Sequence, residues 1–321
     1  MGRQDLMAEP TISVVIPVLN GAKYVDQALG SLAMQRRPPD EVLFVDDGSS
    51  DGSADIAERW SAILPIRVLR LASNQGSWAA RNAAVDSTDA DLIALLDIDD
   101  IWLPDHLAVL LAAYVERPGL ITANAMMWVE ELALGRPWNA RRPVPPASQQ
   151  VEQLLLENYV FTGSLFSRDL CRSVGGFRSF TLGCEDWDLW LRMVAAGTTV
   201  IRTDLPTALY RLHDDSLSAN NSELDSEIEV LESFKREHDN PRWHRAADRA
   251  IRRRRAKQHL RASYEAARGG RSLAARLHAM RSFQGASRDG RIAAAAMTIL
   301  PVRASARRDV MRHNPARAVH R

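Results

Sequence analysis

The sequence predicts an α/β protein with a mostly parallel β-sheet sandwiched by helices, followed by an α-helical extension at the C-terminus. Three observations lead to this prediction. Short runs of apolar and β-branched residues alternate with helical segments through the first third of the chain, a spacing typical of βαβ units. Polar or acidic residues follow each of the first four of these runs. From about Glu223 onward, the pattern is helical throughout.

The predicted elements follow in order along the chain. The apolar runs 12–16, 41–45, 66–71 and 92–96 are predicted strands, and helical spacing marks 22–34, 53–63, 77–85 and 104–115. Further strands are predicted at 120–129, 161–167 and 199–203, and helices at 151–157, 169–174 and 185–194. Residues 136–146 contain four prolines and are predicted to form a surface loop or lid, and residues 210–216 a polar strand or loop. Residues 264–277 indicate helix, glycine turn, helix.

Charge divides the chain into two parts although the net charge is only +1. From residue 240 onward there are 21 basic and four acidic residues, whereas 20 basic and 36 acidic residues precede it. Hydrophobic residues make up 46% and charged residues 25%, as in ordinary globular proteins. This division of charge suggests two functional regions.

The sequence gives little indication of export or membrane insertion. The two cysteines, Cys171 and Cys184, do not make a disulfide framework, and no pattern supports a Cys–His catalytic pair. No signal-peptide pattern is present, and the apolar run 292–302 is too short to span a bilayer and contains Pro301. We expect a cytoplasmic protein, with peripheral contact at the inner face of the membrane left open.

Four polar clusters are expected to meet at one edge of the sheet. Residues 17–20, 46–51, 74–81 and 97–100 follow the first, second, third and fourth predicted strands. Because the carboxyl ends of parallel strands lie at the same edge, ligands bind there in open α/β sheets. The sequence therefore predicts a single active site at this edge.

The acidic stretch Asp97-Ile98-Asp99-Asp100 has two interpretations by itself. A D-x-D at the end of a buried strand is suited to holding a divalent metal against a phosphate. The alternative is a loop whose aspartates cap the following helix, with Pro104 in its first turn. The convergence of the four clusters favours a binding site.

Six motifs in order resemble family 2 glycosyltransferases of the GT-A fold. The resemblance covers about residues 10–217 and not the C-terminal hundred. It implies a GT-A glycosyltransferase domain over residues 10–220, followed by a basic α-helical region over residues 221–321. The motifs are Val15-Ile16-Pro17-Val18-Leu19-Asn20, Val45-Asp46-Asp47-Gly48-Ser49-Ser50-Asp51-Gly52-Ser53, Asn74-Gln75-Gly76 with Ala80-Arg81-Asn82, Leu96-Asp97-Ile98-Asp99-Asp100, Glu185-Asp186-Trp187-Asp188-Leu189-Trp190, and Tyr210-Arg211-Leu212-His213.

The resemblance implies a role for each matching residue. Asp186 matches the catalytic base, and Asp99 matches the D-x-D residue on the metal, which is Mn²⁺ or Mg²⁺. His213 matches a histidine that approaches the diphosphate or metal, and Asp47 the aspartate that hydrogen-bonds the base, usually uracil. The resemblance places the following residues at the nucleotide-sugar: Pro17, Val18, Asn20, Asp47, Gly76, Arg81, Asp97 and Asp99.

Each of these residues also has a structural interpretation. Asp47 could belong to a turn, and Arg81 to a solvated helix face. Asp186 could be a helix N-cap or a first-turn acid favoured by the helix dipole. Trp102 could stack on a sugar or pack in the core, and His213 could be a structural hydrogen-bonding group. Together the motifs favour the functional roles.

The expected activity is metal-dependent transfer of a sugar, with inversion, from a nucleotide-sugar. The donor is expected to be a UDP-sugar, and the acceptor a hydroxyl of a glycan or lipid-linked molecule in cell-surface polysaccharide assembly. Two rivals stay open: a nucleotidyltransferase of similar fold, and a degenerate GT-A module that only binds nucleotide-sugar.

The basic C-terminal region is a separate question. Its arginines, including the run 252–255, are compatible with nucleic acid, anionic lipid, the acidic part of this chain or solvent. No aromatic residues alternate with them in a way that would support nucleic-acid recognition, so peripheral contact with an anionic membrane is favoured.

Overall fold

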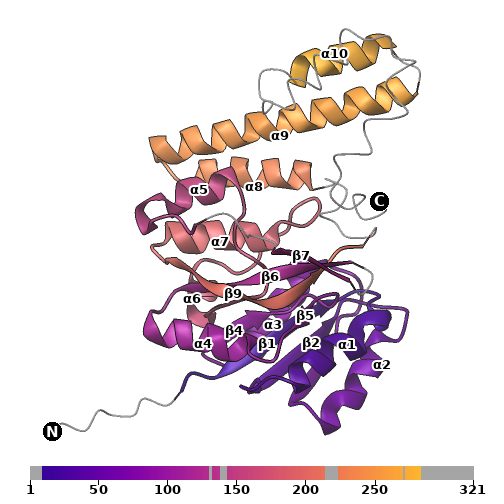
Figure 1. The fold of residues 1–321 in the computed structure, drawn as a ribbon, viewed down its shortest axis with the longest axis vertical. Helices are drawn as coiled ribbons and strands as arrows, with labels where there is room; N and C mark the ends of the chain where they lie inside the picture. The colour runs from indigo at the N-terminus through magenta and orange to yellow at the C-terminus, as the bar shows by residue number, and fades with distance from the viewer. Residues whose placement is uncertain (1–8, 130–131, 138–142, 214–222, 270–271, 283–321) are drawn as a thin grey trace, which may run out of the picture. The chain divides into compact units, whose positions relative to one another are not determined.

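A nine-stranded mixed β-sheet forms the centre of the first of two compact units in the computed structural model (Figure 1). The structure describes residues 9–129, 132–137, 143–213, 223–269 and 272–282. The strand order is β3-β2-β1-β4-β8-β6-β9-β5, and β7 pairs with β6. The strands are β1 (Ile12–Val18), β2 (Glu41–Asp46), β3 (Ile66–Arg70), β4 (Leu92–Leu95), β5 (Ile101–Trp102), β6 (Leu120–Val129), β7 (Leu132–Pro137), β8 (Ser164–Ser167) and β9 (Val200–Arg211).

The first four strands are parallel and confirm the sheet edge expected from the sequence. β1 pairs in parallel with both β2 and β4, and β2 pairs in parallel with β3. Val18, the last residue of β1, lies opposite Asp46, the last residue of β2. β8 runs antiparallel to β4 and β6, which makes the sheet mixed. The carboxyl ends of β1 to β4 therefore open onto one edge.

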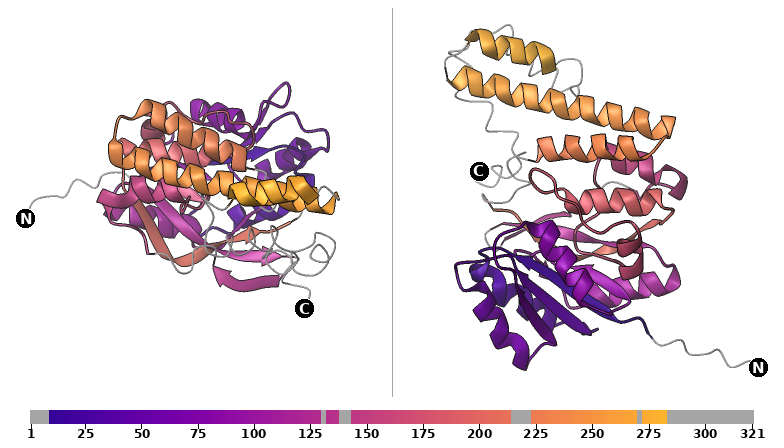
Figure 2. Two further views of the ribbon diagram at one scale, coloured as in Figure 1. Left: turned by 90° about the horizontal axis from the view of Figure 1, so that it is seen from above. Right: turned by 180° about the vertical axis from the view of Figure 1, so that it is seen from behind.

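Helices cover both faces of this sheet (Figures 1 and 2). On one face, Val14 and Ile16 of β1 share an apolar core with Val25 and Leu29. The helices contributing to this core are α1 (Ala22–Ala33), α2 (Ser53–Glu58) and α4 (His106–Glu116). α3 (Ser77–Ser87) packs on β1 and β2, and α7 (Glu185–Ala195) packs through Trp190 on Phe166 of β8. The first unit also contains α6 (Arg168–Ser173), whereas α5 (Gln150–Leu156) belongs to the second unit from Glu152 onward.

Several predicted boundaries are corrected by the structure. The predicted helix 53–63 is α2 followed by a 3₁₀ turn, η1 (Arg59–Ala62), and a second such turn, η2 (Ala147–Gln149), precedes α5. The predicted strand 161–167 begins only at Ser164. The segments 199–203 and 210–211 are joined in the single long strand β9, whose pairing with β6 shifts register near Asn124. β5 is too short to produce a sequence period, and residues 138–142 and 214–216 lie outside the described residues.

Besides residues 152–157, the second unit contains the described helices of the C-terminal region, as the helical pattern predicted: α8 (Leu224–Glu237), α9 (Pro241–Arg268) and α10 (Ser272–Ser282). The Asn240 side chain caps the start of α9. Ion pairs join α8 to α9, among them Lys235 to Asp248 at 2.5 Å and Arg254 to Glu227 at 2.6 Å. None of the described helices is both long and apolar enough to cross a membrane. The apolar run 292–302 lies outside the described residues.

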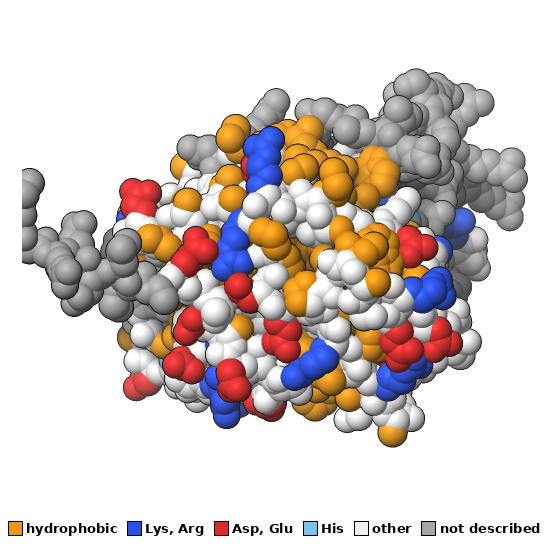
Figure 3. Space-filling model, turned by 90° about the horizontal axis from the view of Figure 1, so that it is seen from below, with side chains coloured by type: hydrophobic (Ala, Val, Ile, Leu, Met, Phe, Trp, Pro, Cys, Tyr) orange, Lys and Arg blue, Asp and Glu red, His pale blue; other side chains and the backbone are white. Residues whose placement is uncertain are grey.

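Charged side chains of both signs are interspersed on the face that Figure 3 shows. Surface ion pairs of the first unit follow the same pattern. Arg70 contacts Asp55 at 2.6 Å and Glu58 at 2.8 Å, and Arg36 contacts Asp105 at 2.7 Å. The first unit therefore balances many of its exposed charges locally.

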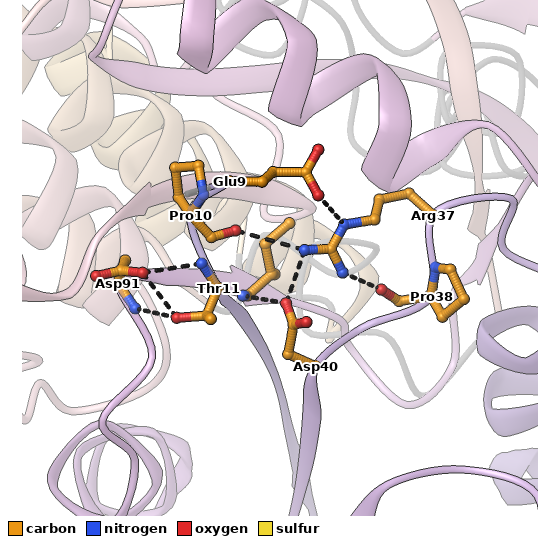
Figure 4. Close-up of polar contacts among 8 residues, drawn as sticks. Glu9, Pro10, Thr11, Arg37, Pro38, Asp40 and Asp91 are labelled. Atoms are coloured by element: carbon orange, nitrogen blue, oxygen red, sulfur yellow. Dashed lines mark hydrogen bonds and ion pairs between the residues drawn. The ribbon is translucent and has the colours of Figure 1, made fainter. Parts of the chain in front are cut away.

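A polar network fixes the start of β1, at the opposite end of the strand from the predicted site (Figure 4). The Thr11 backbone N–H and hydroxyl donate to Asp91 at 2.9 and 2.8 Å. Arg37 pairs with Glu9 at 3.2 Å and with Asp40 at 2.8 Å. Asp40 also accepts the backbone N–H of Ile12 at 2.7 Å. These contacts hold β1 beside both of its parallel neighbours.

Candidate active site

The loops after β1, β2 and β3 are hydrogen-bonded to one another. The Asn20 side-chain oxygen accepts the Ser50 backbone N–H at 2.9 Å, and the Asn20 N–H donates to the Ser49 hydroxyl at 2.9 Å. Asn20 has a φ of 53°, in the left-handed region that asparagine tolerates better than most residues. The Asp47 N–H donates to the Val18 carbonyl at 2.8 Å. Pro17 and Val18 lie within β1, directly before this loop.

Asp47 anchors the loop after β3. Its two carboxylate oxygens accept the backbone N–H groups of Gln75, at 2.8 Å, and Gly76, at 2.7 Å. Gly76 has a φ of 98°, which favours glycine, and its position immediately before α3 starts that helix. The Asp47 side chain is buried at 2% exposure. The residue that the resemblance matched to base recognition thus holds the shape of the loop after β3.

Arg81 links the two halves of the predicted site. Its guanidinium donates to Asp97 of the D-x-D at 2.8 Å and also to Glu185, the residue before the matched catalytic base. The Ser77 hydroxyl donates to the same Glu185 carboxylate. Arg81 is 5% exposed, so a solvated role on the helix face is wrong. The arginine contacts carboxylates from two loops and keeps them at a fixed separation.

Asp186 lies at the start of α7 with both oxygens engaged. Oδ2 accepts the Thr162 hydroxyl at 3.1 Å, and Oδ1 accepts the Trp187 backbone N–H at 2.6 Å. The N-cap position of α7 is Cys184, which has a φ of 71°, and not Asp186. The second interpretation, a first-turn acid, is compatible with this position. A first-turn acid does not need a hydrogen bond from another element. The hydrogen bond from Thr162 is therefore an additional feature of Asp186.

Burial raises the pKa of two carboxyl groups around Arg81. Burial raises the pKa of Asp97 to about 6, against the lowering effect of Arg81, with Asp99 and Asp186 adding to the rise. Burial also raises the pKa of Asp186, with Arg81 again opposing and Glu185 adding to the rise. The carboxylates favour the charged state of Arg81, whose pKa is raised although burial opposes it. The site therefore concentrates carboxylates around one cation.

Asp99 and His213 form the pair that fits a metal ion. His213 Nε2 lies 2.9 Å from Asp99 Oδ2, and both side chains are partly exposed. A carboxylate oxygen with an imidazole nitrogen is a donor set that Mn²⁺ accepts, and the carboxylate alone suits Mg²⁺. Among the described residues, no group of three or more His, Cys, Asp or Glu is set to hold an ion. The pair would therefore need donor phosphates and water to complete the coordination.

The remaining acidic residue, Asp100, holds the loop. It is buried, and its Oδ1 accepts the Arg211 backbone N–H at 3.0 Å. The capping interpretation of the D-x-D is wrong, because the N-cap position of α4 is Asp105. Trp102 is 2% exposed and stacks on His106, so it packs in the core and does not stack on a sugar.

Three residues that had no role predicted from the sequence contact the predicted site. Glu185 stood inside a quoted motif, and its contact with Arg81 spans 104 residues. Thr162 had no sequence signal. Arg211 stood inside the Tyr-Arg-Leu-His motif; its Nε donates to the Asp99 carbonyl at 2.8 Å, and its guanidinium lies 4.0 Å from the Trp128 ring centroid. These residues hold the carboxylates that the motifs identified.

Comparison with known proteins bears on the same region. The family model for glycosyl transferase family 2 matches residues 13–175. The amylovoran biosynthesis glycosyltransferase AmsE of Erwinia amylovora is 28% identical over 65% of this chain and 78% of its own length. The putative teichuronic acid biosynthesis glycosyltransferase TuaG of Bacillus subtilis is 28% identical over 66% of this chain and 83% of its own length.

Solved structures share the fold. Residues 1–349 of S. aureus TarS in complex with UDP-GlcNAc superpose with a TM-score of 0.65 at 17% identity, covering 90% of this chain and 89% of that one. The mannosyltransferase PcManGT from Pyrobaculum calidifontis, in complex with GDP-Man and Mn²⁺, gives a TM-score of 0.59 at 19% identity, covering 91% and 88%. These likenesses confirm the GT-A type of fold expected from the sequence.

Proposed function

This chain belongs to glycosyltransferase family 2 and is a glycosyltransferase, and we propose that it is a metal-dependent, inverting enzyme that uses a UDP-sugar. The observation that carries the proposal is Arg81, which joins Asp97 of the D-x-D to the Glu185–Asp186 pair in one cluster. TarS and PcManGT are described in complex with UDP-GlcNAc and with GDP-Man and Mn²⁺, which supports a nucleotide-sugar donor and a divalent ion.

In the proposed reaction, an acceptor hydroxyl attacks the sugar C1 while the bond from C1 to the diphosphate oxygen breaks. The new bond is O–C1, and the electron pair of the broken bond leaves with the nucleoside diphosphate. Asp186 takes the hydroxyl proton, and Thr162 and the Trp187 N–H keep its carboxylate oriented. Because the base lies opposite the leaving group in such a displacement, the anomeric configuration inverts.

The donor side is assigned to the loops around β1 to β4. We assign Pro17, Val18, Asn20, Asp47, Gly76, Arg81, Asp97 and Asp99 to the nucleotide-sugar site. Asp47 and Arg81 act there by shaping the loop after β3 and by fixing the carboxylates. Asp99 and His213 would hold Mn²⁺ or Mg²⁺, which, when bound, neutralises negative charge on the leaving diphosphate.

The acceptor is proposed to be a glycan or lipid-linked molecule in cell-surface polysaccharide assembly. The names of AmsE and TuaG, which refer to amylovoran and teichuronic acid biosynthesis, support this class of pathway. Peripheral contact of the basic C-terminal region with the inner face of an anionic membrane would keep the enzyme beside a lipid-linked acceptor.

Release of nucleoside diphosphate tests the proposal. The protein is incubated with Mn²⁺ and a panel of nucleotide-sugars, and release is expected with at least one donor and loss of release with a chelator. Asp99→Asn is expected to abolish metal-dependent release. Asp89→Asn is the matched control, because that carboxylate is fully exposed beside Arg168. Donor binding without release from any donor would favour the module that only binds nucleotide-sugar and would contradict the enzyme proposal.

A further inference from the structure

Helix α10 exposes an apolar stripe although it is packed on α9. Its inner side carries Ala275 and Ala279, which are fully buried in a small core with Ala266 and Ala267 of α9. The Ser263 hydroxyl of α9 also donates to the Ala275 carbonyl at 2.7 Å. These contacts fix which side of α10 faces away from α9.

The outward side carries three large apolar residues in a row. Leu273 is 72% exposed, Leu277 45% and Met280 55%. Spacings of four and three residues place them on one face of the helix. Scattered single apolar side chains on a surface are normal, but three on one face of an 11-residue helix form a continuous stripe.

Arginines border this stripe on both sides. At 100° per residue, Arg276 lies on one side of the stripe and Arg281 on the other, and both are exposed. We call these five residues, Leu273, Arg276, Leu277, Met280 and Arg281, the α10 face. α10 contains no acidic residue. By contrast, the face in Figure 3 mixes acidic and basic side chains.

We propose that the α10 face binds a membrane surface that contains anionic phospholipids. An apolar stripe bordered by arginines suits the boundary between acyl chains and headgroups, because arginine stems lie along apolar surface while their guanidinium groups reach phosphates. The helix lies on the membrane in this arrangement and does not span it. The inference rests on the membrane contact in the proposed function and assigns that contact to the α10 face. Vesicle binding tests it separately from sugar transfer.

The dimensions of the α10 face argue against a second copy of the chain as its partner. An 11-residue helix is about 16 Å long and about 10 Å across. This is far below the roughly 800 Å² per partner that stable protein interfaces bury. A second copy would also bring the same two arginines to the contact, without acidic residues from α10 to pair with them.

Vesicle flotation of the full chain tests the proposal. Wild type is expected to float with vesicles of phosphatidylglycerol and phosphatidylcholine and not with phosphatidylcholine alone. Arg276→Gln with Arg281→Gln is expected to weaken binding roughly 30-fold, because each arginine near an anionic surface contributes about five-fold. Replacing Leu273, Leu277 and Met280 by serine is expected to weaken binding by at least about 100-fold.

Matched controls separate a local effect from general loss of apolar surface. Met34→Ser with Ile63→Ser removes two side chains that are 68% and 66% exposed in the first unit, and it is expected to float like wild type. Circular dichroism checks the helix content of the α10 variants. It is expected to be unchanged, because Ala275 and Ala279, which pack α10 on α9, are retained. Release of nucleoside diphosphate, measured in parallel, is expected to be unchanged in all variants.

Three results would overturn the proposal. The first is that wild type does not float with anionic vesicles, and the second is that the α10 variants float like wild type. Alternatively, the serine variant converts a dimer to a monomer in light scattering while vesicle binding is unchanged, which would identify the α10 face as a self-association surface. If no nucleotide-sugar is turned over but flotation depends on the α10 face, the membrane inference stands and the proposed function fails.

Discussion

At the residue scale, Asp186 has the properties that a general base requires. Burial raises its pKa, the Arg81 cation limits the rise, and two donors fix its oxygens. Asp186→Asn removes the proton acceptor but keeps the size of the side chain. We expect the rate of transfer to fall by roughly 10²–10⁴, because general-base catalysis contributes that much. Donor binding, measured by calorimetry, should change little.

The control for this substitution is Asp169→Asn, which alters an exposed first-turn aspartate of α6. Transfer by the control should equal that of wild type. Transfer by Asp186→Asn within a few-fold of wild type would show that another group accepts the proton.

Arg81 is expected to set the acid limb of the pH profile. The base acts when deprotonated, so activity falls as the pH decreases through the pKa of Asp186, which burial has raised. Arg81 lowers that pKa, so Arg81→Gln should raise it and move the acid limb of kcat to higher pH. Arg81→Lys keeps the charge and should move the limb less.

Arg81→Gln should also reduce stability, because Glu185 is left buried without its cation. Removing one partner of a buried pair costs about 3–5 kcal/mol, which denaturant unfolding would measure. An acid limb at the same pH in wild type and Arg81→Gln would contradict the assignment of Asp186 as the titrating base.

At the scale of elements, His106 connects the start of α4 to β9. It is fully buried, its Nδ1 lies 2.9 Å from the Thr207 hydroxyl, and its ring stacks on Trp102 at 4.1 Å. Burial lowers the pKa of His106 from 6.5 to about 3. The imidazole therefore stays neutral in the folded state at a pH where the unfolded chain binds a proton.

The sign of the pH effect follows from this difference. The contribution of His106 to the free energy of unfolding is present above the pKa of this histidine in the unfolded chain, which is 6.5. It is lost as the pH falls below that value, because protons bind the unfolded chain preferentially. Between pH 7 and pH 5 this histidine should cost about 2 kcal/mol in the free energy of unfolding. The His106→Leu variant should lack that part of the pH slope in denaturant titrations, whatever its stability at pH 7. Equal slopes in both proteins would contradict a neutral His106.

The sequence predicted an element well where its hydrophobic pattern and the residues of the neighbouring loops indicated the same structure. The strands β1 to β4 and the polar loops after them were predicted because a buried parallel strand is a continuous apolar run, and the edge where they meet follows from parallel pairing. β5 was not predicted, because two residues have no period. The Arg81–Glu185 contact was not predicted either, since it joins positions 104 apart that only packing brings together.

At the scale of the whole molecule, the contacts separate the described chain into two compact units. We keep the proposal of a catalytic domain over residues 10–220 and a basic helical region over residues 221–321. Residues 152–157 group with the helical unit, where Arg254 donates to the Leu156 carbonyl at 3.4 Å. Arg254 belongs to the four-arginine run but is buried against Glu227, so that run serves packing as well as surface charge.

Calorimetry with and without ligand should reveal these two units. The proposed donor site belongs to the first unit alone, so UDP with Mn²⁺ should stabilise only that unit. At a hundred-fold excess over Kd the gain is about 2.7 kcal/mol, which raises the midpoint of one transition by roughly 5–10 °C and leaves the other unmoved. In Asp99→Asn the shift should lose its dependence on Mn²⁺, because the carboxylate assigned to the metal is neutralised. A single transition that moves as a whole would contradict the separation, since ligand binding would then be coupled to the unfolding of the C-terminal helices as well.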